Sequence, residues 1–130
     1  MGDTERFAGV WRLVSYETRQ ADGATAQPFG ADAVGMLIYT PDGFMSGQVM
    51  RGGRESGREG TDGYIAYCGR YRVEEEKGEV VHRVEASLYP GWVGSEQRRG
   101  YAFEGTRLVL SAKLRRKGVE IVYELVWERA

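Results

Sequence analysis

Short segments in which apolar and polar residues alternate recur along this chain, and each one stops at a turn signal. Alternation with a period of two is typical of β-strands that bury one face. Pro41–Gly43 joins two such segments; Pro presets φ and Gly accepts a positive φ, so a hairpin is expected there. The segments expected to form strands are Trp11–Glu17, Val34–Thr40, Phe44–Met50, Ile65–Val73, Val80–Tyr89, Gln97–Phe103, Leu108–Lys113 and Val119–Arg129.

The close spacing of these segments, without any long helical periodicity, predicts an all-β chain. We expect all of the strands to be antiparallel and to form a barrel or a sandwich. The longest break between them, Arg51–Gly63, is Gly-rich and charged, and it is expected to be a mobile loop with at most one helical turn.

The composition limits the class of protein. The chain of 130 residues is long enough for one core, so residues 1–130 are expected to form a single domain. A net charge of -1 without a basic excess argues against a nucleic-acid partner. No stretch approaches the roughly 20 apolar residues of a membrane helix. The N-terminus lacks signal-peptide features and Cys68 is the only cysteine, so a cytoplasmic location is expected.

Strand parity predicts which side chains point into the barrel. In four segments the inner set mixes apolar residues with tyrosines and other polar side chains. The two segments beside Pro41–Gly43 are apolar on both faces, so parity does not say which of their faces is inner. The predicted inner residues are Ile65, Tyr67, Gly69, Tyr71 and Val73; Val80, His82, Val84, Ala86 and Leu88; Gln97, Arg99, Tyr101 and Phe103; and Ile121, Tyr123, Leu125, Trp127 and Arg129.

Polar groups inside a barrel need hydrogen-bond partners, and a buried charge needs them most. A dense internal network would supply them, and so would a cavity that holds a ligand. We favour a cavity; the alternative is that the tyrosines fill the barrel completely. The candidate ligand-binding residues are Tyr67, Tyr71, His82, Trp92, Gln97, Arg99, Tyr101 and Tyr123.

Three of these candidates have a defined chemistry and an ordinary alternative. Arg99 would anchor an anionic group, or else pair with a carboxylate at the end of the barrel. His82, the only histidine, would transfer protons in an enclosed pocket, or else be a core histidine bonded to a tyrosine hydroxyl or a backbone carbonyl. Trp92 would stack on a ligand at the barrel mouth, or else pack on a neighbouring loop.

Motifs spread over nearly the whole chain carry a family resemblance. They are GVWRLVSYE, PFGADAVGMLIYTPDGFMSGQVMR, YIAYCGRYRVEEEKGEVVHRVEASLYPGWVGSEQRRGY and LVWERA. Together they resemble the bacterial and fungal lipocalin-like domain family of calycin-type barrels, which implies an antiparallel up-and-down β-barrel of about eight strands. In the wider lipocalin superfamily, the Trp of a Gly-x-Trp motif plugs the closed end of the barrel and an Arg of the last strand packs on it. Gly9, Trp11 and Arg129 match those positions.

This interpretation gives one leading function and leaves others open. The leading hypothesis is binding of a small, mostly apolar or aromatic metabolite with an anionic or polar end inside the barrel. The alternative is a cofactor-free isomerase or cyclase that acts on a polyketide-like natural product, with His82 as its catalytic residue. A third reading is a filled barrel with a structural or interaction role.

No cofactor and no metal are expected, because one Cys and one His do not make a usual zinc site. Whether the chain is an enzyme stays open at this point. Its oligomeric state is open too, and a homodimer is one alternative because two-fold oligomers are common.

Overall fold

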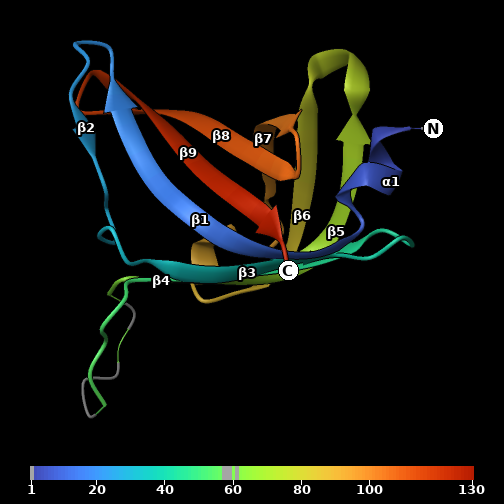
Figure 1. The fold of residues 1–130 in the computed structure, drawn as a ribbon, viewed down its shortest axis with the longest axis horizontal. Coiled ribbons are helices and arrows are strands. Elements are labelled where there is room, and N and C mark those ends of the chain that lie inside the picture. The colour runs from blue at the N-terminus through green and yellow to red at the C-terminus, as the bar shows by residue number, and fades with distance from the viewer. Residues whose placement is uncertain (1, 57–59, 61) are drawn as a thin grey trace.

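The computed structural model describes residues 2–56, 60 and 62–130 (Figure 1). Residues 57–59 and 61 of the predicted Arg51–Gly63 loop lie outside the described residues. None of the helices in the described part has the length and apolarity that a membrane crossing needs. The strands are β1 (Gly9–Gln20), β2 (Thr25–Ala26), β3 (Val34–Tyr39), β4 (Phe44–Met50), β5 (Tyr64–Glu74), β6 (Glu79–Ser87), β7 (Glu96–Glu104), β8 (Arg107–Arg116) and β9 (Val119–Arg129); the helices are α1 (Asp3–Phe7) and the 3₁₀ turns η1 (Glu75–Lys77) and η2 (Pro90–Trp92).

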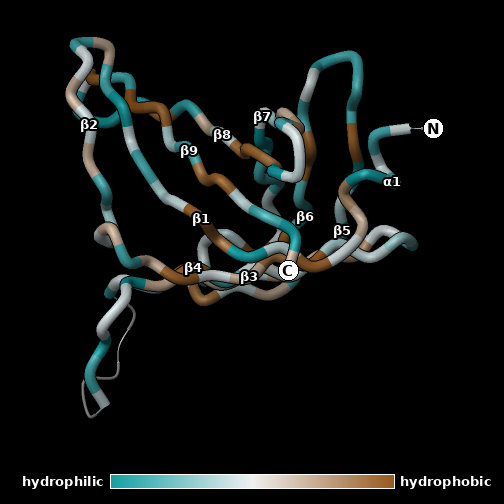
Figure 2. The backbone as a smooth tube through the Cα atoms, viewed as in Figure 1, coloured by the Kyte–Doolittle hydropathy of each residue, from teal (hydrophilic) through white to brown (hydrophobic). Residues whose placement is uncertain are grey.

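The strands form one antiparallel sheet that closes on itself. Its order is β1-β3-β4-β5-β6-β7-β8-β9, and β9 pairs back with β1. The predicted all-β, up-and-down barrel is therefore confirmed. The short extra strand β2 pairs with β1 at Thr18 and Arg19, and two exposed residues after a turn carry no alternation from which it could be predicted. Hydrophobic and hydrophilic residues are interspersed along the barrel strands (Figure 2), as one buried face requires.

A cluster of aromatic side chains fills one end of the barrel. Helix α1 brings Phe7, which is fully buried, against the rings of Tyr39, Tyr101 and Phe103 at centroid distances of 5.1, 5.0 and 5.0 Å. The indole Nε1 of Trp11 donates to the backbone oxygen of Phe7 at 2.9 Å. The helix and the first strand therefore close this end together.

The Gly-x-Trp motif and the last strand meet at the same end, as the resemblance implies. The Arg129 guanidinium carbon lies 4.3 Å from the centre of the Trp11 ring. The guanidinium also donates to the backbone oxygens of Arg6 at 2.6 Å and Ala8 at 2.8 Å. Gly9 has a φ of 135°, and a Cβ at this position would collide with the guanidinium. The motif thus needs glycine both for its backbone conformation and for space.

The structure also settles the faces of the hairpin around Pro41–Gly43. Leu37 and Tyr39 of β3 are 3% and 1% exposed, and Met45 and Val49 of β4 are equally buried, so these side chains form the inner face. The sequence could not show this, because the opposite faces also carry large apolar residues: Val34, Met36 and Ile38 in β3, and Phe44 and Met50 in β4.

The predicted inner face of β6 is wrong beyond Val84. Cys68 pairs with Ala86, whereas the next residue of β5, Gly69, pairs with Val84. The extra residue on β6 is a β-bulge, and it reverses the alternation after it. Ala86 and Leu88 are therefore exposed instead of internal.

Candidate ligand-binding site

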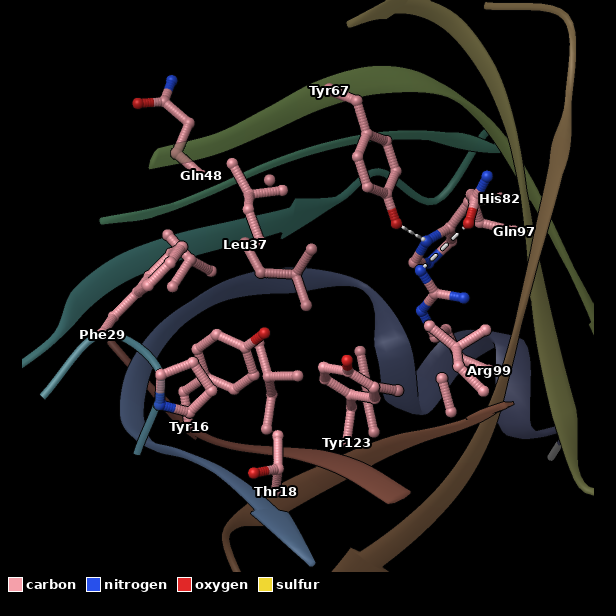
Figure 3. Close-up of a pocket in the computed structure, with 18 of the residues that line it drawn as sticks. Tyr16, Thr18, Phe29, Leu37, Gln48, Tyr67, His82, Gln97, Arg99 and Tyr123 are labelled. Atoms are coloured by element: carbon pink, nitrogen blue, oxygen red, sulfur yellow. Dashed lines mark hydrogen bonds between the residues drawn. The ribbon is translucent and has the colours of Figure 1, made fainter. Parts of the chain in front are cut away.

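A cavity of about 540 Å³ occupies the barrel interior beyond the core around Trp11 (Figure 3). Small-molecule pockets typically have volumes of roughly 300–1,000 Å³. All of the barrel strands contribute to its lining, which is mostly apolar and aromatic. The lining includes Tyr16, Phe29, Leu37, Val49, Ile65, Tyr67, His82, Tyr89, Trp92, Gln97, Arg99, Leu110, Arg116, Tyr123, Leu125 and Trp127.

A buried chain of hydrogen bonds runs through His82 to the cavity wall (Figure 3). The Nε2 atom lies 2.7 Å from the Tyr39 hydroxyl, and the Nδ1 atom lies 2.6 Å from the Tyr67 hydroxyl. His82 is 2% exposed, and burial, followed by the positive charge of Arg99, lowers its pKa from 6.5 to about 3. The imidazole is therefore neutral near pH 7, with one donor nitrogen and one acceptor nitrogen.

Arg99 on β7 lies near Tyr67, at the end of this series of hydrogen bonds that faces the cavity. It donates to the Gln97 side-chain oxygen at 3.2 Å and to the Arg98 carbonyl at 3.0 Å, and its charge partly offsets the rise that burial causes in the pKa of Tyr67. These acceptors are neutral, and no ion pair joins Arg99 to a carboxylate within the described residues. Arg116 also lines the cavity, whereas no Asp or Glu of the described chain does. The fixed charge of the lining is thus entirely positive.

The same described residues contain no group of three or more His, Cys, Asp or Glu side chains that could hold a metal ion. The side chain of Trp127 also lines the cavity, while its Nε1–H is buried and makes no hydrogen bond with the described residues. The guanidinium of Arg99 has donors only. This charged group therefore favours ligand atoms that accept hydrogen bonds.

Aromatic rings form two parts of the cavity wall. Trp92 in η2 contacts Tyr67 and Tyr89 edge to face, with centroid distances of 5.7 and 5.1 Å. Phe29, from the segment between β2 and β3, packs edge to face on Tyr16 at 5.2 Å. Trp92 therefore packs on its neighbours, as one of its two alternatives expects, and it also lines the cavity. Walls of this kind suit a flat aromatic ligand.

Six of the sequence-predicted site residues line the cavity, and two do not. Tyr71 is buried and donates to the Thr40 carbonyl at 2.7 Å, while Tyr101 packs on Phe7. Both belong to the inner face, as parity predicts, but they lie at the closed end of the barrel. Parity fixes the face of a strand and carries no information on height along the barrel axis. The residues that line the cavity as predicted are Tyr67, His82, Trp92, Gln97, Arg99 and Tyr123.

Other lining residues were missed for identifiable reasons. Alternation counted from Trp11 places Tyr16 outside, but a bulge between Leu13 and Ser15 turns Tyr16 inward. Phe29 lies between strands, where parity has no meaning. The only local hint was a large aromatic residue within a turn-forming Pro-Phe-Gly stretch.

The closed barrel and its enclosed cavity define a class of small ligand-binding β-barrels. Residues 8–130 match the lipocalin-like domain family, and the chain belongs to this family, as its motifs predicted. The 4'-hydroxy-3'-methoxypropiophenone carrier protein of Aspergillus oryzae is 37% identical to the chain over 106 residues, a match that covers 65% of this chain and 96% of that protein. No solved structure matches the chain significantly.

Proposed function

We propose that this protein binds and carries a small aromatic ligand that has an oxygen at its polar end. The observation behind the proposal is Arg99, a guanidinium with only neutral partners in a mostly apolar cavity that no carboxylate of the described chain lines. Such a group is a natural partner for an anionic oxygen. The aromatic part of the ligand would lie among the rings of Trp92, Tyr16 and Phe29.

The carrier from Aspergillus oryzae supports this choice of ligand class. The compound in its name, 4'-hydroxy-3'-methoxypropiophenone, is a phenol with an acyl group para to the hydroxyl. The acyl group withdraws electrons from the ring and makes the phenol more acidic. A ligand of this kind combines a flat ring with an oxygen that readily becomes anionic.

Isothermal titration calorimetry with this phenolic ketone tests the proposal. Arg99→Gln is expected to weaken binding by about 1.5–3 kcal/mol, roughly tenfold to a hundredfold, because it removes a charged hydrogen bond. Arg83→Gln is a matched control, since Arg83 is an exposed residue of β6 that does not line the cavity. This control should bind as wild type does.

Equal affinities of Arg99→Gln and wild type would contradict the anchoring role of Arg99. The compound recovered after binding also separates carrier from enzyme. Unchanged compound supports the carrier, whereas conversion to an isomer would support the cofactor-free isomerase or cyclase with His82 as its catalytic residue. Both ring nitrogens of His82 are engaged by tyrosine hydroxyls, so no specific observation favours that alternative.

A further inference from the structure

We propose that the hydrogen-bond chain Tyr39–His82–Tyr67 keeps the ring hydrogen of His82 on Nδ1 and directs the hydroxyl hydrogen of Tyr67 into the cavity. Tyr67 and Arg99 then form a pair of donors for a ligand oxyanion. This inference rests on the proposed carrier function and adds the protonation state in which the ligand binds. His82 acts in it as a positioning residue.

Tyr39 determines which groups donate and which accept in this hydrogen-bond chain, because its hydroxyl is fully enclosed. The residue is 1% exposed, and burial keeps the pKa of its hydroxyl well above the ordinary value, so the hydroxyl keeps its hydrogen. Within the described residues, Nε2 of His82 is the hydrogen-bond partner of this hydroxyl, at 2.7 Å. A buried hydrogen without an acceptor is costly, so Tyr39 donates to Nε2.

The position of the ring hydrogen of His82 follows from this bond. A neutral imidazole carries a single hydrogen, and with Nε2 accepting, that hydrogen is on Nδ1. Nδ1 therefore donates to the Tyr67 hydroxyl oxygen at 2.6 Å. The guanidinium of Arg99, which has donors only, lies near this hydroxyl, and its charge partly offsets the rise that burial causes in the pKa of Tyr67.

Tyr67 thus accepts the hydrogen bond from Nδ1 through its hydroxyl oxygen. Its own hydrogen has no acceptor within the described residues, and the side chain lines the cavity. Burial also raises the pKa of Tyr67, so its hydroxyl remains a donor. The hydrogen bond that it accepts from His82 polarises the hydroxyl and strengthens it as a donor.

Arg99 supplies the second donor and the charge. Its guanidinium has five N–H groups, and the bonds to Gln97 and Arg98 leave some of them free. Figure 3 shows the guanidinium beside the Tyr67 hydroxyl and His82. Two donors and one positive charge fit an oxygen that has lone pairs and no hydrogen.

A phenolate meets this requirement and also carries the negative charge that complements Arg99. A phenol binds here by heterolysis of its O–H bond: the oxygen keeps the electron pair and the proton passes to the buffer. A neutral phenol would gain no charge pairing with Arg99, and its hydrogen would face the donors of the guanidinium, which is unfavourable.

The first test needs no variant. His82 is the only histidine, so nitrogen-15 NMR of the ligand-free protein near pH 7 reports on its ring alone. The expected result is a protonated Nδ1 and an unprotonated Nε2. A hydrogen on Nε2 would overturn the proposal, because Tyr67 would then donate to His82 and offer the cavity no hydrogen.

The second test is the absorption spectrum of the same phenolic ketone at a pH below its own pKa, where the free compound is neutral. On binding, the long-wavelength band of the phenolate is expected. Tyr67→Phe should lower the affinity about tenfold and remove most of this band. Tyr64→Phe is the control, because Tyr64 is a tyrosine of β5 that does not line the cavity, and this change should leave the band unchanged.

The outcomes separate this inference from the proposed function. If the wild-type protein binds the ketone with the spectrum of a neutral phenol, the oxyanion site is wrong. That result would not contradict the proposed carrier function. A band that persists in Tyr67→Phe, or that is lost equally in Tyr64→Phe, would also overturn the oxyanion site. No binding of the ketone to the wild type would contradict the carrier proposal itself.

Discussion

Burial gives His82 properties that differ sharply from those of an exposed histidine. Its two nitrogens bond to hydroxyls from β3 and β5, so the ring links three strands through one side chain. Within the barrel, protonation would add a second positive charge near Arg99 in a site shielded from water. The native state therefore resists protonation of His82 down to a pH of about 3.

This resistance predicts acid destabilisation at mild pH. The unfolded chain binds a proton as the pH falls through about 6.5, and the native state does not until about pH 3. Stability is thus complete above pH 6.5 and falls below it, with a slope approaching about 1.4 kcal/mol per pH unit. Urea unfolding at several pH values between 5 and 7 measures this slope.

The control for this prediction is His82→Gln, in which an amide both donates and accepts but does not titrate. The slope between pH 6.5 and 5 should disappear in this variant. An unchanged slope would assign the effect to another group. Carboxylates such as Glu74 are protonated mainly below about pH 4.5. Between pH 6.5 and 5 the pH dependence of stability therefore comes chiefly from the histidine.

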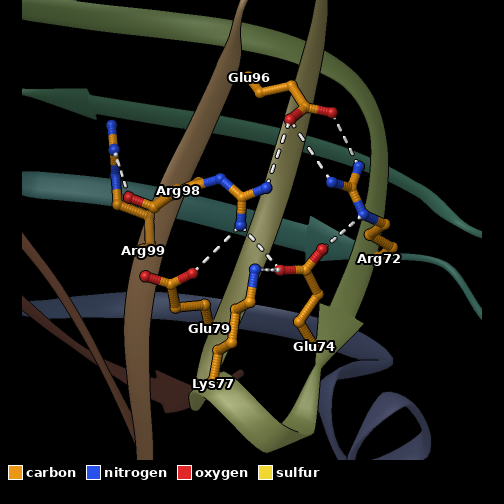
Figure 4. Close-up of polar contacts among 7 residues, drawn as sticks. All are labelled: Arg72, Glu74, Lys77, Glu79, Glu96, Arg98 and Arg99. Carbon is orange, nitrogen blue, oxygen red and sulfur yellow. Dashed lines mark hydrogen bonds and ion pairs between the residues drawn. The ribbon is translucent and has the colours of Figure 1, made fainter.

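The outer faces of β5, β6 and β7 are joined by a network of ion pairs (Figure 4). Glu74 at the end of β5 accepts hydrogen bonds from Arg98 at 2.7 Å and from Arg72 at 3.0 Å. These bonds lower the pKa of Glu74 to about 2. Arg72 and Arg98 reach Glu96 and Glu79 as well, so the network ties together the strands that carry Tyr67, His82 and Arg99.

Glu74→Gln is expected to lower the Tm, because it removes the carboxylate shared by two arginines. The loss should shrink in 1 M salt, where exposed charges are screened. It should also shrink as the pH falls from 4.5 towards 2, since the wild-type carboxylate is then protonated too. Thermal unfolding followed by circular dichroism measures all three effects.

A single exposed pair provides the comparison for this network. Glu120 lies 4.0 Å from Arg115 on neighbouring strands, with both side chains largely exposed. Glu120→Gln is therefore expected to change the Tm little. Equal losses in the two variants would show that the network contributes no more than an isolated surface pair.

Closure of the whole barrel depends on contacts between the two ends of the chain. β1 and β9 pair along most of their length, and Arg129 adds bonds to the backbone at Arg6 and Ala8. Its guanidinium also covers the Trp11 ring. The last strand thus fixes the first strand and the helix that plugs the barrel.

Arg129→Met is expected to reduce the free energy of unfolding by about 1–2 kcal/mol, since it removes the cation–π contact and the bonds to backbone oxygens while it keeps the apolar stem. Urea unfolding measures the change. Arg107→Met, at an exposed arginine of β8, is the matched control and should cost less. A similar loss in both variants would contradict the closing role of Arg129.

The sequence by itself determined the eight strands of the barrel and the inner faces of β5, β7 and β9, and its motifs indicated the family and hence the barrel. Alternation and turn chemistry are local properties, so they can be read from neighbouring residues. Arg99 and His82 could be selected in this way, because polar side chains on an apolar inner face are conspicuous in the sequence.

Only the tertiary structure decided the rest. The bulges that expose Ala86 and turn Tyr16 inward depend on pairing with another strand. Strand pairing also sets the positions of Tyr71 and Tyr101 along the barrel axis, at the closed end and outside the cavity lining. The bonds from His82 to Tyr39 and Tyr67 join residues that are 43 and 15 positions apart. Local patterns fix which way a side chain points, whereas closure of the barrel fixes which side chains it meets.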